Sequence, residues 1–114
     1  MDEIKELGKI QAFDVGLGGY QNVMLGVSIT LGGEGWVVCD HKGTWSPANI
    51  EWSEMTKWSE DDRDKSFSEV MRFIDKTLSE AKKKRTQDLI GVPIEATFEG
   101  FNKLKSWRIF TEVL

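Results

Sequence analysis

Val23-Met24-Leu25-Gly26-Val27-Ser28-Ile29-Thr30-Leu31 is the stretch that decides the fold of this 114-residue chain. Apolar side chains occupy every odd position, whereas the even positions after Met24 hold small or polar residues. This period of two is typical of a β-strand that buries one face. We therefore expect a strand over residues 23–31, with its odd-numbered side chains on one face.

The segments on either side of this strand predict an antiparallel meander. Gly32-Gly33-Glu34-Gly35 predicts a hairpin turn, after which residues 36–40 form the returning strand. Before it, residues 9–15 predict another strand, and Gly16-Leu17-Gly18-Gly19 supplies the turn because glycine readily adopts positive φ. The first part of the chain therefore predicts three consecutive antiparallel strands.

Residues 60–84 predict one long amphipathic helix. Ser59 is a favourable N-cap, and Asp62 stands three residues later as in a capping box. The basic run Lys82-Lys83-Lys84-Arg85 follows at the negative end of the helix dipole. One apolar stripe has helical spacing and consists of Phe67, Val70, Met71, Ile74, Leu78 and Ala81. This stripe needs a partner, and a sheet face is the only large one available.

Two further strands are expected after the helix. Pro93 starts an alternating segment over residues 93–99, and a second alternating segment that includes Trp107 runs to the end of the chain. The predicted order is therefore βββαββ. We expect a single α+β domain over residues 1–114, with one mainly antiparallel sheet and the helix packed on one of its faces.

Composition narrows the classes of function. The chain carries 15 basic and 19 acidic residues, a formal net charge of −4, which argues against nonspecific binding to duplex DNA. Its single cysteine allows no internal disulfide, and no apolar run is long enough for a signal peptide or a membrane span. We therefore expect a soluble cytoplasmic protein without membrane contact. The sequence holds no catalytic or cofactor motif, so neither an enzymatic activity nor a cofactor is expected.

Tryptophan is concentrated in one region, since four of the five lie within 23 residues: Trp36, Trp45, Trp52 and Trp58. Residues 43–58 have no clean period and predict a long loop, which often carries function. In one interpretation, Trp36 is a core strand residue and the other three fix this loop to the domain. In the other, those three line a ligand pocket or a partner surface. Lys42 and Lys57 are the nearest cations, so a nucleotide ligand stays open.

Cys39-Asp40-His41 brings a thiol, a carboxylate and an imidazole together. These groups can bind metal, and cysteine with histidine can form a nucleophile pair. Neighbours on a strand point to opposite faces, so only Cys39 and His41 would share one. The chain has no second cysteine or histidine to complete a zinc site. We therefore expect a structural or incidental use and no metal, while His41 stays a candidate for ligand contact.

Tyr20 and Arg108 are two further candidates for ligand contact. Tyr20 follows a glycine-rich turn and could stack on a ligand, although the turn lacks the Gly-Lys-Ser or Gly-Lys-Thr ending of a Walker motif. Arg108 lies among strand hydrophobics, where an arginine usually has an anionic partner. A cross-strand ion pair with Glu95 or Glu99 is favoured over a ligand phosphate.

Two charged runs each allow two interpretations. An acidic surface could mimic DNA or bind a basic partner, although a solvated loop and helix start is favoured; it comprises Glu51, Glu54, Glu60, Asp61, Asp62 and Asp64. The basic run at residues 82–85 is more often a solvated helix end than a contact to phosphate or an acidic partner. Opposite charges at the two ends of one helix would also suit antiparallel helix pairing in a homodimer.

The chain also resembles a group of small uncharacterised proteins found in tailed-phage genomes and prophages. The similarity covers most of the chain, and the closing segment is its most distinctive part. It rests on Gly18-Gly19-Tyr20-Gln21, Gly35-Trp36, Trp58-Ser59-Glu60-Asp61-Asp62-Arg63, Val92-Pro93-Ile94-Glu95-Ala96-Thr97-Phe98 and Leu104-Lys105-Ser106-Trp107-Arg108-Ile109-Phe110-Thr111-Glu112-Val113-Leu114. The resemblance implies a phage origin and an accessory role during infection, but no catalytic residue. Small phage accessory proteins often counter host defence by binding a defence protein or sequestering a signalling nucleotide.

These observations favour a small, non-catalytic phage accessory protein that binds a host protein or a small nucleotide in the host cytoplasm. The residues expected to contact the ligand or partner are Tyr20, His41, Lys42, Trp45, Trp52, Trp58 and Arg108. The alternative is a single-stranded nucleic-acid-binding protein of phage replication or recombination, since aromatic side chains on a sheet stack bases. A homo-oligomer stays open in both cases.

Overall fold

A computed structural model describes residues 3–18, 23–46, 59–100 and 103–114. Its elements are β1 (Glu3–Gly18), β2 (Met24–Gly33), β3 (Trp36–Trp45), α1 (Glu60–Ala81), η2 (Thr86–Leu89), β4 (Pro93–Glu99), β5 (Leu104–Ile109) and η3 (Thr111–Val113). Every strand pair is antiparallel, and the strands are arranged in the order β3-β2-β1-β4-β5. The predicted α+β class and the order βββαββ are therefore confirmed.

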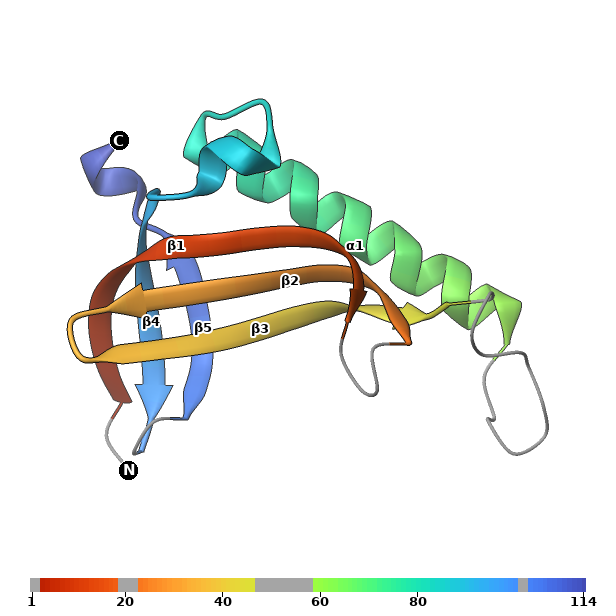
Figure 1. Cartoon of the computed structure of the whole chain (residues 1–114), viewed down its shortest axis with the longest axis horizontal. Helices are drawn as coiled ribbons and strands as arrows, with labels where there is room; N and C mark the ends of the chain where they lie inside the picture. The colour runs from red at the N-terminus through yellow and green to blue at the C-terminus, as the bar shows by residue number, and fades with distance from the viewer. Residues whose placement is uncertain (1–2, 19–22, 47–58, 101–102) are drawn as a thin grey trace.

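The long strand β1 curls the sheet into a half-barrel, because its two halves pair with different strands (Figure 1). Residues 3–9 pair with β4, and residues 8–18 pair with β2. The register shifts between Ile10 and Ala12, and such an irregularity bends a strand and increases its twist. The sequence predicted only residues 9–15, since the earlier segment is rich in charge and owes its strand conformation to a distant partner.

The helix α1 covers the concave face of this sheet (Figure 1). Val27, Ile29 and Leu31 of the predicted central strand are each 0% exposed, so the alternation in the sequence places them correctly. The sheet residues packed with them in the core are Ile10, Phe13, Ile94, Ala96, Phe98 and Ile109. Removal of this apolar surface from water is the main stabilising contribution to the fold.

Of the predicted helical stripe, Val70 and Ala81 lie in the core and Ile74 and Leu78 pack against it, whereas Met71 is 65% exposed. Phe73 packs against the core instead, and Thr77 is buried at 3% exposure. Each step along a helix turns the side chain by about 100°, so the face defined by Val70, Phe73 and Thr77 turns Met71 away from the sheet. Thr77 can be buried because its hydroxyl donates a 2.8 Å hydrogen bond to the carbonyl of Phe73.

The helix begins as predicted but ends earlier. Ser59 and Asp62 form the complete capping box. The helix stops at Ala81, and Lys82 adopts the left-handed conformation at φ 59°, so the basic run lies beyond the last turn rather than within it. Early termination allows η2 to place Leu89 in the core with 0% exposure. Among the described helices, none has the length and apolar character needed to cross a bilayer.

Two strand ends also differ from prediction. β3 continues to Trp45 instead of ending at residue 40, because β2 extends to Met24 and supplies a partner along the whole length. Conversely, β5 ends at Ile109 and the chain turns into η3, although alternation predicted a strand to the terminus. The N–H of Phe110 bonds to the carbonyl of Pro93, where β4 begins, so the ladder has no further partner strand there.

Trp36 is partly buried and packs against the core from β3, close to the interpretation that expected a core strand residue. Its indole lies against two glycines: a Cβ on Gly33 would be 2.5 Å from Nε1, and one on Gly8 would be 2.8 Å from Cζ2. Phe98 meets the ring edge-to-face, with 5.1 Å between the centroids. The absence of side chains on these glycines is therefore what accommodates the indole.

Candidate functional site

Asp40 connects the two outer strands of the curled sheet. The indole N–H of Trp107 on β5 donates a 3.1 Å hydrogen bond to Oδ2 of Asp40 on β3. Nζ of Lys42 lies 3.9 Å from the same oxygen. Asp40 and Lys42 stand two positions apart on β3 and therefore share the face that looks toward α1. A carboxylate, an ammonium group and an indole thus meet at one point.

Phe73 of α1 completes this group from the helix side. Its ring meets Trp107 edge-to-face with centroids 6.0 Å apart, and Nζ of Lys42 lies 5.0 Å from its centre. A cation at that distance from an aromatic face is attracted by the ring quadrupole. Phe13 stacks on Phe73 from the core, with 6.3 Å between centroids, so the ring is held on the sheet side.

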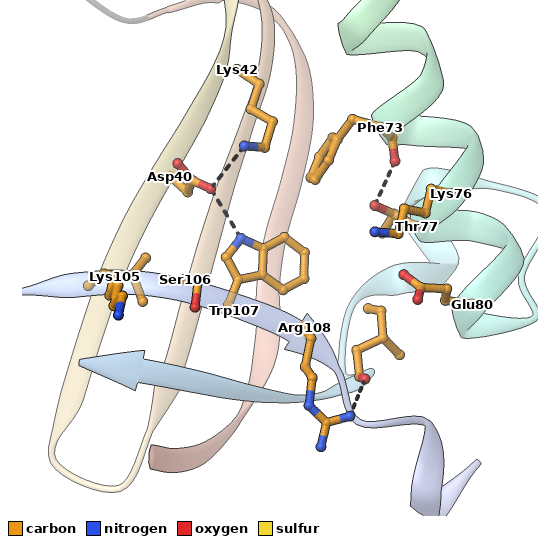
Figure 2. A pocket seen from close by; sticks show the side chains of 12 residues that line it. Asp40, Lys42, Phe73, Lys76, Thr77, Glu80, Lys105, Ser106, Trp107 and Arg108 are labelled. Atoms are coloured by element: carbon orange, nitrogen blue, oxygen red, sulfur yellow. Dashed lines mark hydrogen bonds and ion pairs between the residues drawn. The ribbon is translucent and has the colours of Figure 1, made fainter. Parts of the chain in front are cut away.

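These residues line a cleft of about 420 Å³ between α1 and the outer strands (Figure 2). Ligand pockets usually enclose about 300–1,000 Å³, so the cleft has the size for a small molecule. The charged side chains that line it are Lys42, Lys76, Lys105, Arg108, Asp40 and Glu80. The lining of the cleft therefore includes four cations and two carboxylates around an aromatic pair.

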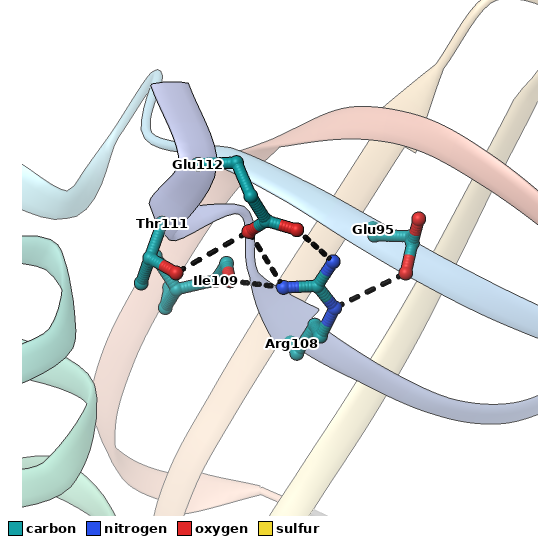
Figure 3. A network of polar contacts seen from close by, with 5 residues as sticks. All are labelled: Glu95, Arg108, Ile109, Thr111 and Glu112. Atoms are coloured by element: carbon teal, nitrogen blue, oxygen red, sulfur yellow. Dashed lines mark hydrogen bonds and ion pairs between the residues drawn. The ribbon is translucent and has the colours of Figure 1, made fainter. Parts of the chain in front are cut away.

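Arg108 is paired with two carboxylates that do not line the cleft (Figure 3). Its Nε lies 3.1 Å from Glu95, which confirms the expected cross-strand ion pair, and its Nη1 and Nη2 lie 2.9 and 2.6 Å from Glu112. The hydrogen bonds that Arg108 donates lower the pKa of Glu112 to about 2, and their acceptance by Glu112 and Glu95 raises the pKa of Arg108. The guanidinium is therefore committed to protein carboxylates.

Lys105 is also paired, whereas Lys76 is not. Lys105 donates a 2.8 Å hydrogen bond to Glu3, which raises the pKa of Lys105 and lowers that of Glu3. Within the described ranges, Lys76 forms no ion pair. Lys76 is therefore the cleft cation most readily presented to a ligand, and Lys42 is the next, since its only ion pair within the described residues is the 3.9 Å contact with Asp40.

His41 and Cys39 do not line this cleft. The Nδ1 of His41 lies 3.0 Å from the hydroxyl of Ser28, and Sγ of Cys39 lies 3.6 Å from that of Thr30. Both contacts join cross-strand neighbours of β2 and β3. The described part of the chain contains no group of three His, Cys, Asp or Glu side chains that could hold a metal.

Trp45 lies on β3, not in the expected loop, and its side chain is partly buried. Its carbonyl accepts a 3.0 Å hydrogen bond from Nε of Arg63, which is 4% exposed and also pairs with Glu60. Because Trp45 is three positions from Lys42, strand alternation puts it on the other face of the sheet. Tyr20, Trp52 and Trp58, with the acidic Glu51 and Glu54, lie outside the described residues.

The structure therefore joins Lys42 to residues that the sequence analysis did not select. The sequence did not indicate Phe73 and Lys76 as site residues, because they border the predicted apolar stripe and have no feature that distinguishes them from other helix positions. Trp107 was expected only as a strand residue, and its partner Asp40 only as part of a doubtful metal trio. Their meeting depends on the curl of the sheet, which brings the two outer strands together.

Comparison with protein-family models, with curated proteins and with solved structures finds no match to this chain. The function is therefore inferred from the chemistry of the cleft. An aromatic pair can pack against a flat ring, lysines can pair with an anion, and carboxylates can accept hydrogen bonds from amino groups.

Proposed function

We propose that the protein binds a small nucleotide, without chemical conversion, in the cleft between α1 and the outer strands. The observation that carries this proposal is the cluster of Asp40, Lys42, Phe73 and Trp107, in which one carboxylate links an ammonium group to an indole. Such a cluster combines the three kinds of group that a nucleotide requires.

Each part of a nucleotide finds a counterpart in the cleft. The base would pack against Trp107 and Phe73, since aromatic faces stack on bases with little sequence preference. Its exocyclic amino group would donate to Asp40 or Glu80, which are acceptors when ionised. The phosphate would pair with Lys42 and Lys76, one from the sheet and one from the helix. An inorganic anion alone would leave the carboxylates without a favourable role.

In the phage setting that the resemblance implies, such binding would remove a signalling nucleotide from a host defence system. Each protein molecule would then remove one nucleotide, so the effect would depend on the amount of protein relative to the nucleotide. Non-catalytic sequestration needs affinity but no reacting group, which agrees with a site built from aromatic rings and ion pairs.

Titration calorimetry with mononucleotides and cyclic dinucleotides tests this proposal. The double variant Lys42→Gln/Lys76→Gln should weaken binding at least roughly tenfold, since hydrogen bonds to charged groups contribute about 1.5–3 kcal/mol each. The matched control is Lys83→Gln/Lys84→Gln, which removes the same charge from exposed positions beyond the helix and should leave affinity unchanged.

Two results would contradict the proposal. One is the absence of heat with every nucleotide at millimolar concentration while the protein stays folded. The other is an equal loss of affinity in the control variant, which would indicate general charge attraction rather than a site. A parallel titration with oligothymidylate examines the alternative function: steeply salt-dependent binding to it, without nucleotide binding, would favour a nucleic-acid-binding protein.

A further inference from the structure

A second cavity, of about 450 Å³, is lined by residues from the start of β1 and from the β2–β3 hairpin turn. Figure 1 shows that these two segments lie at the same end of the sheet. The side chains that line it come from four places: Ile4 and Glu6 on β1, Glu34 in the hairpin turn, Trp36 on β3 and Phe98 on β4. We call this cavity the acidic pocket. It shares no lining residue with the cleft proposed to bind a nucleotide.

Trp36 forms a rigid aromatic wall of the acidic pocket. Gly8 and Gly33 support the indole on the sheet, and Phe98 fixes it edge-to-face. The indole N–H is buried without a hydrogen-bond partner. An unpaired buried donor is costly, so the position of this ring is set by packing and not by a hydrogen bond. A ring held in this way is preorganised to receive a ligand, because it loses little freedom on binding.

Two carboxylates at the acidic pocket give it a negative charge. Glu6 lies opposite Ala96, and Ile4 lies opposite Phe98, so Glu6 and Ile4 share the face that carries Phe98. Glu34 reaches the pocket from the hairpin turn. Both carboxylates are exposed. Neither forms an ion pair with any residue that the structure describes.

We propose that the acidic pocket binds the basic side chain of a protein partner, an arginine or a lysine. The cation would pair with Glu6 and Glu34 and lie against the indole of Trp36, since cations are attracted to indole faces more than to other aromatic rings. The aliphatic stem would cover Ile4, which is 52% exposed, and Phe98. The ligand is thus opposite in charge to a nucleotide.

The position of β3 favours an extended peptide as the carrier of this side chain. β3 is an outer strand of the sheet and begins at Trp36, so a peptide added along its edge would reach the hairpin end of the sheet, where Glu34 and Trp36 line the acidic pocket. Edge addition gives affinity through main-chain hydrogen bonds, and a pocket for one side chain gives specificity. Val37, at 62% exposure, offers an apolar contact to such a peptide on the same strand.

The indole N–H resonance of Trp36 in a ¹⁵N correlation spectrum reports on this site, and Trp36→Phe identifies it by its loss. The probe is an acetylated five-residue peptide with a central arginine between valines. We expect this resonance to shift on titration, and the same peptide with citrulline in place of arginine to leave it unmoved. Glu6→Gln/Glu34→Gln should weaken binding at least tenfold, whereas the matched control Glu69→Gln/Asp75→Asn on α1 should not change it.

Three results would overturn the assignment. The first is a Trp36 resonance that does not shift at millimolar concentrations of the arginine peptide. The second is an affinity for the citrulline peptide equal to that for the arginine peptide, or an affinity of Glu6→Gln/Glu34→Gln equal to that of the parent protein. The third is binding of free putrescine as tight as that of the peptide, since the strand edge would then contribute nothing. The nucleotide proposal is judged separately, because Lys42→Gln/Lys76→Gln leaves the acidic pocket intact and should bind the arginine peptide normally.

Discussion

The indole N–H of Trp107 donates a 3.1 Å hydrogen bond to Asp40, and this contact joins the two outer strands of the sheet without any backbone pairing between them. β3 and β5 are separated in the sheet by three other strands. The curl of the sheet brings their side chains together, and α1 covers the remaining opening. The candidate cleft therefore exists only in the assembled half-barrel.

Replacing Trp107 with phenylalanine tests this connection. The ring contact with Phe73 is retained, but Asp40 loses its donor, so we expect a loss of about 1–2 kcal/mol in the free energy of unfolding. Urea denaturation measures this change. Asp40→Asn, which keeps an acceptor oxygen, should cost less. Equal stability of Trp107→Phe and the parent protein would show that the hydrogen bond does not hold the outer strands together.

Replacing Arg63 with methionine tests the anchor of the helix start. Methionine fills much of the buried volume, but the carbonyl of Trp45 loses the donor at 3.0 Å. We expect a destabilisation of about 2 kcal/mol, because a part-buried hydrogen bond from a charged donor is lost. Thermal unfolding is the measurement. Glu60→Gln is the control: the Glu60 side chain is 66% exposed, so its pair with Arg63 should matter little.

Gly33→Ala tests the seat of the Trp36 ring. The new Cβ would lie 2.5 Å from Nε1 of Trp36 and 2.7 Å from the carbonyl oxygen of Leu7, so the ring or the strands must shift, at a cost of about 1–3 kcal/mol. Gly16→Ala is the matched control on a neighbouring strand, since a Cβ there meets nothing within 4 Å. The control should be neutral or slightly stabilising, because alanine restricts the unfolded chain. Chemical denaturation measures the stability of both variants. Equal free energies of unfolding would contradict the proposed close packing of the Trp36 ring on Gly33.

The titration of Glu112 tests the Arg108 ion pair. The hydrogen bond from Arg108 lowers the pKa of Glu112 from an ordinary 4.5 to about 2. Because the folded-state pKa is the lower one, the pair stabilises the fold fully above pH 4.5, and this contribution is lost as the pH falls through about 2. Carboxyl ¹³C shifts follow the titration. Arg108→Gln should raise the midpoint, whereas Glu95→Gln should leave it low; an ordinary midpoint in the parent protein would contradict the pairing.

Local patterns in the sequence determine much of the fold. The alternation around Ile29 and the capping box at Ser59 are set by neighbours within a few residues, so a reader of the sequence can place both. The first half of β1 and the last residues of β3 take their conformation from partner strands. Their own side chains carry little alternation, and their boundaries were therefore misjudged.

The candidate site was harder to predict than the fold. Lys42 was selected because it is a cation near tryptophans; it lines the cleft, and its contact with a ligand stays a prediction. Phe73 and Trp107 contact each other although they lie on a helix and a strand far apart in the chain. Only the rotation of α1 about its axis and the curl of the sheet determine such contacts, and a single sequence does not encode them as a pattern.

The division of β1 between two partner strands also bears on how the chain folds. Its second half pairs with β2, the next strand along the chain. Its first half pairs with β4, which follows the helix and is far away in the sequence. Contacts between distant segments form slowly because a long loop must close first. The meander of β1, β2 and β3 can thus assemble early, and the ladder between Glu3 and Glu99 would be among the last to form. Both proposed binding sites would then arise late in folding, together with the native half-barrel.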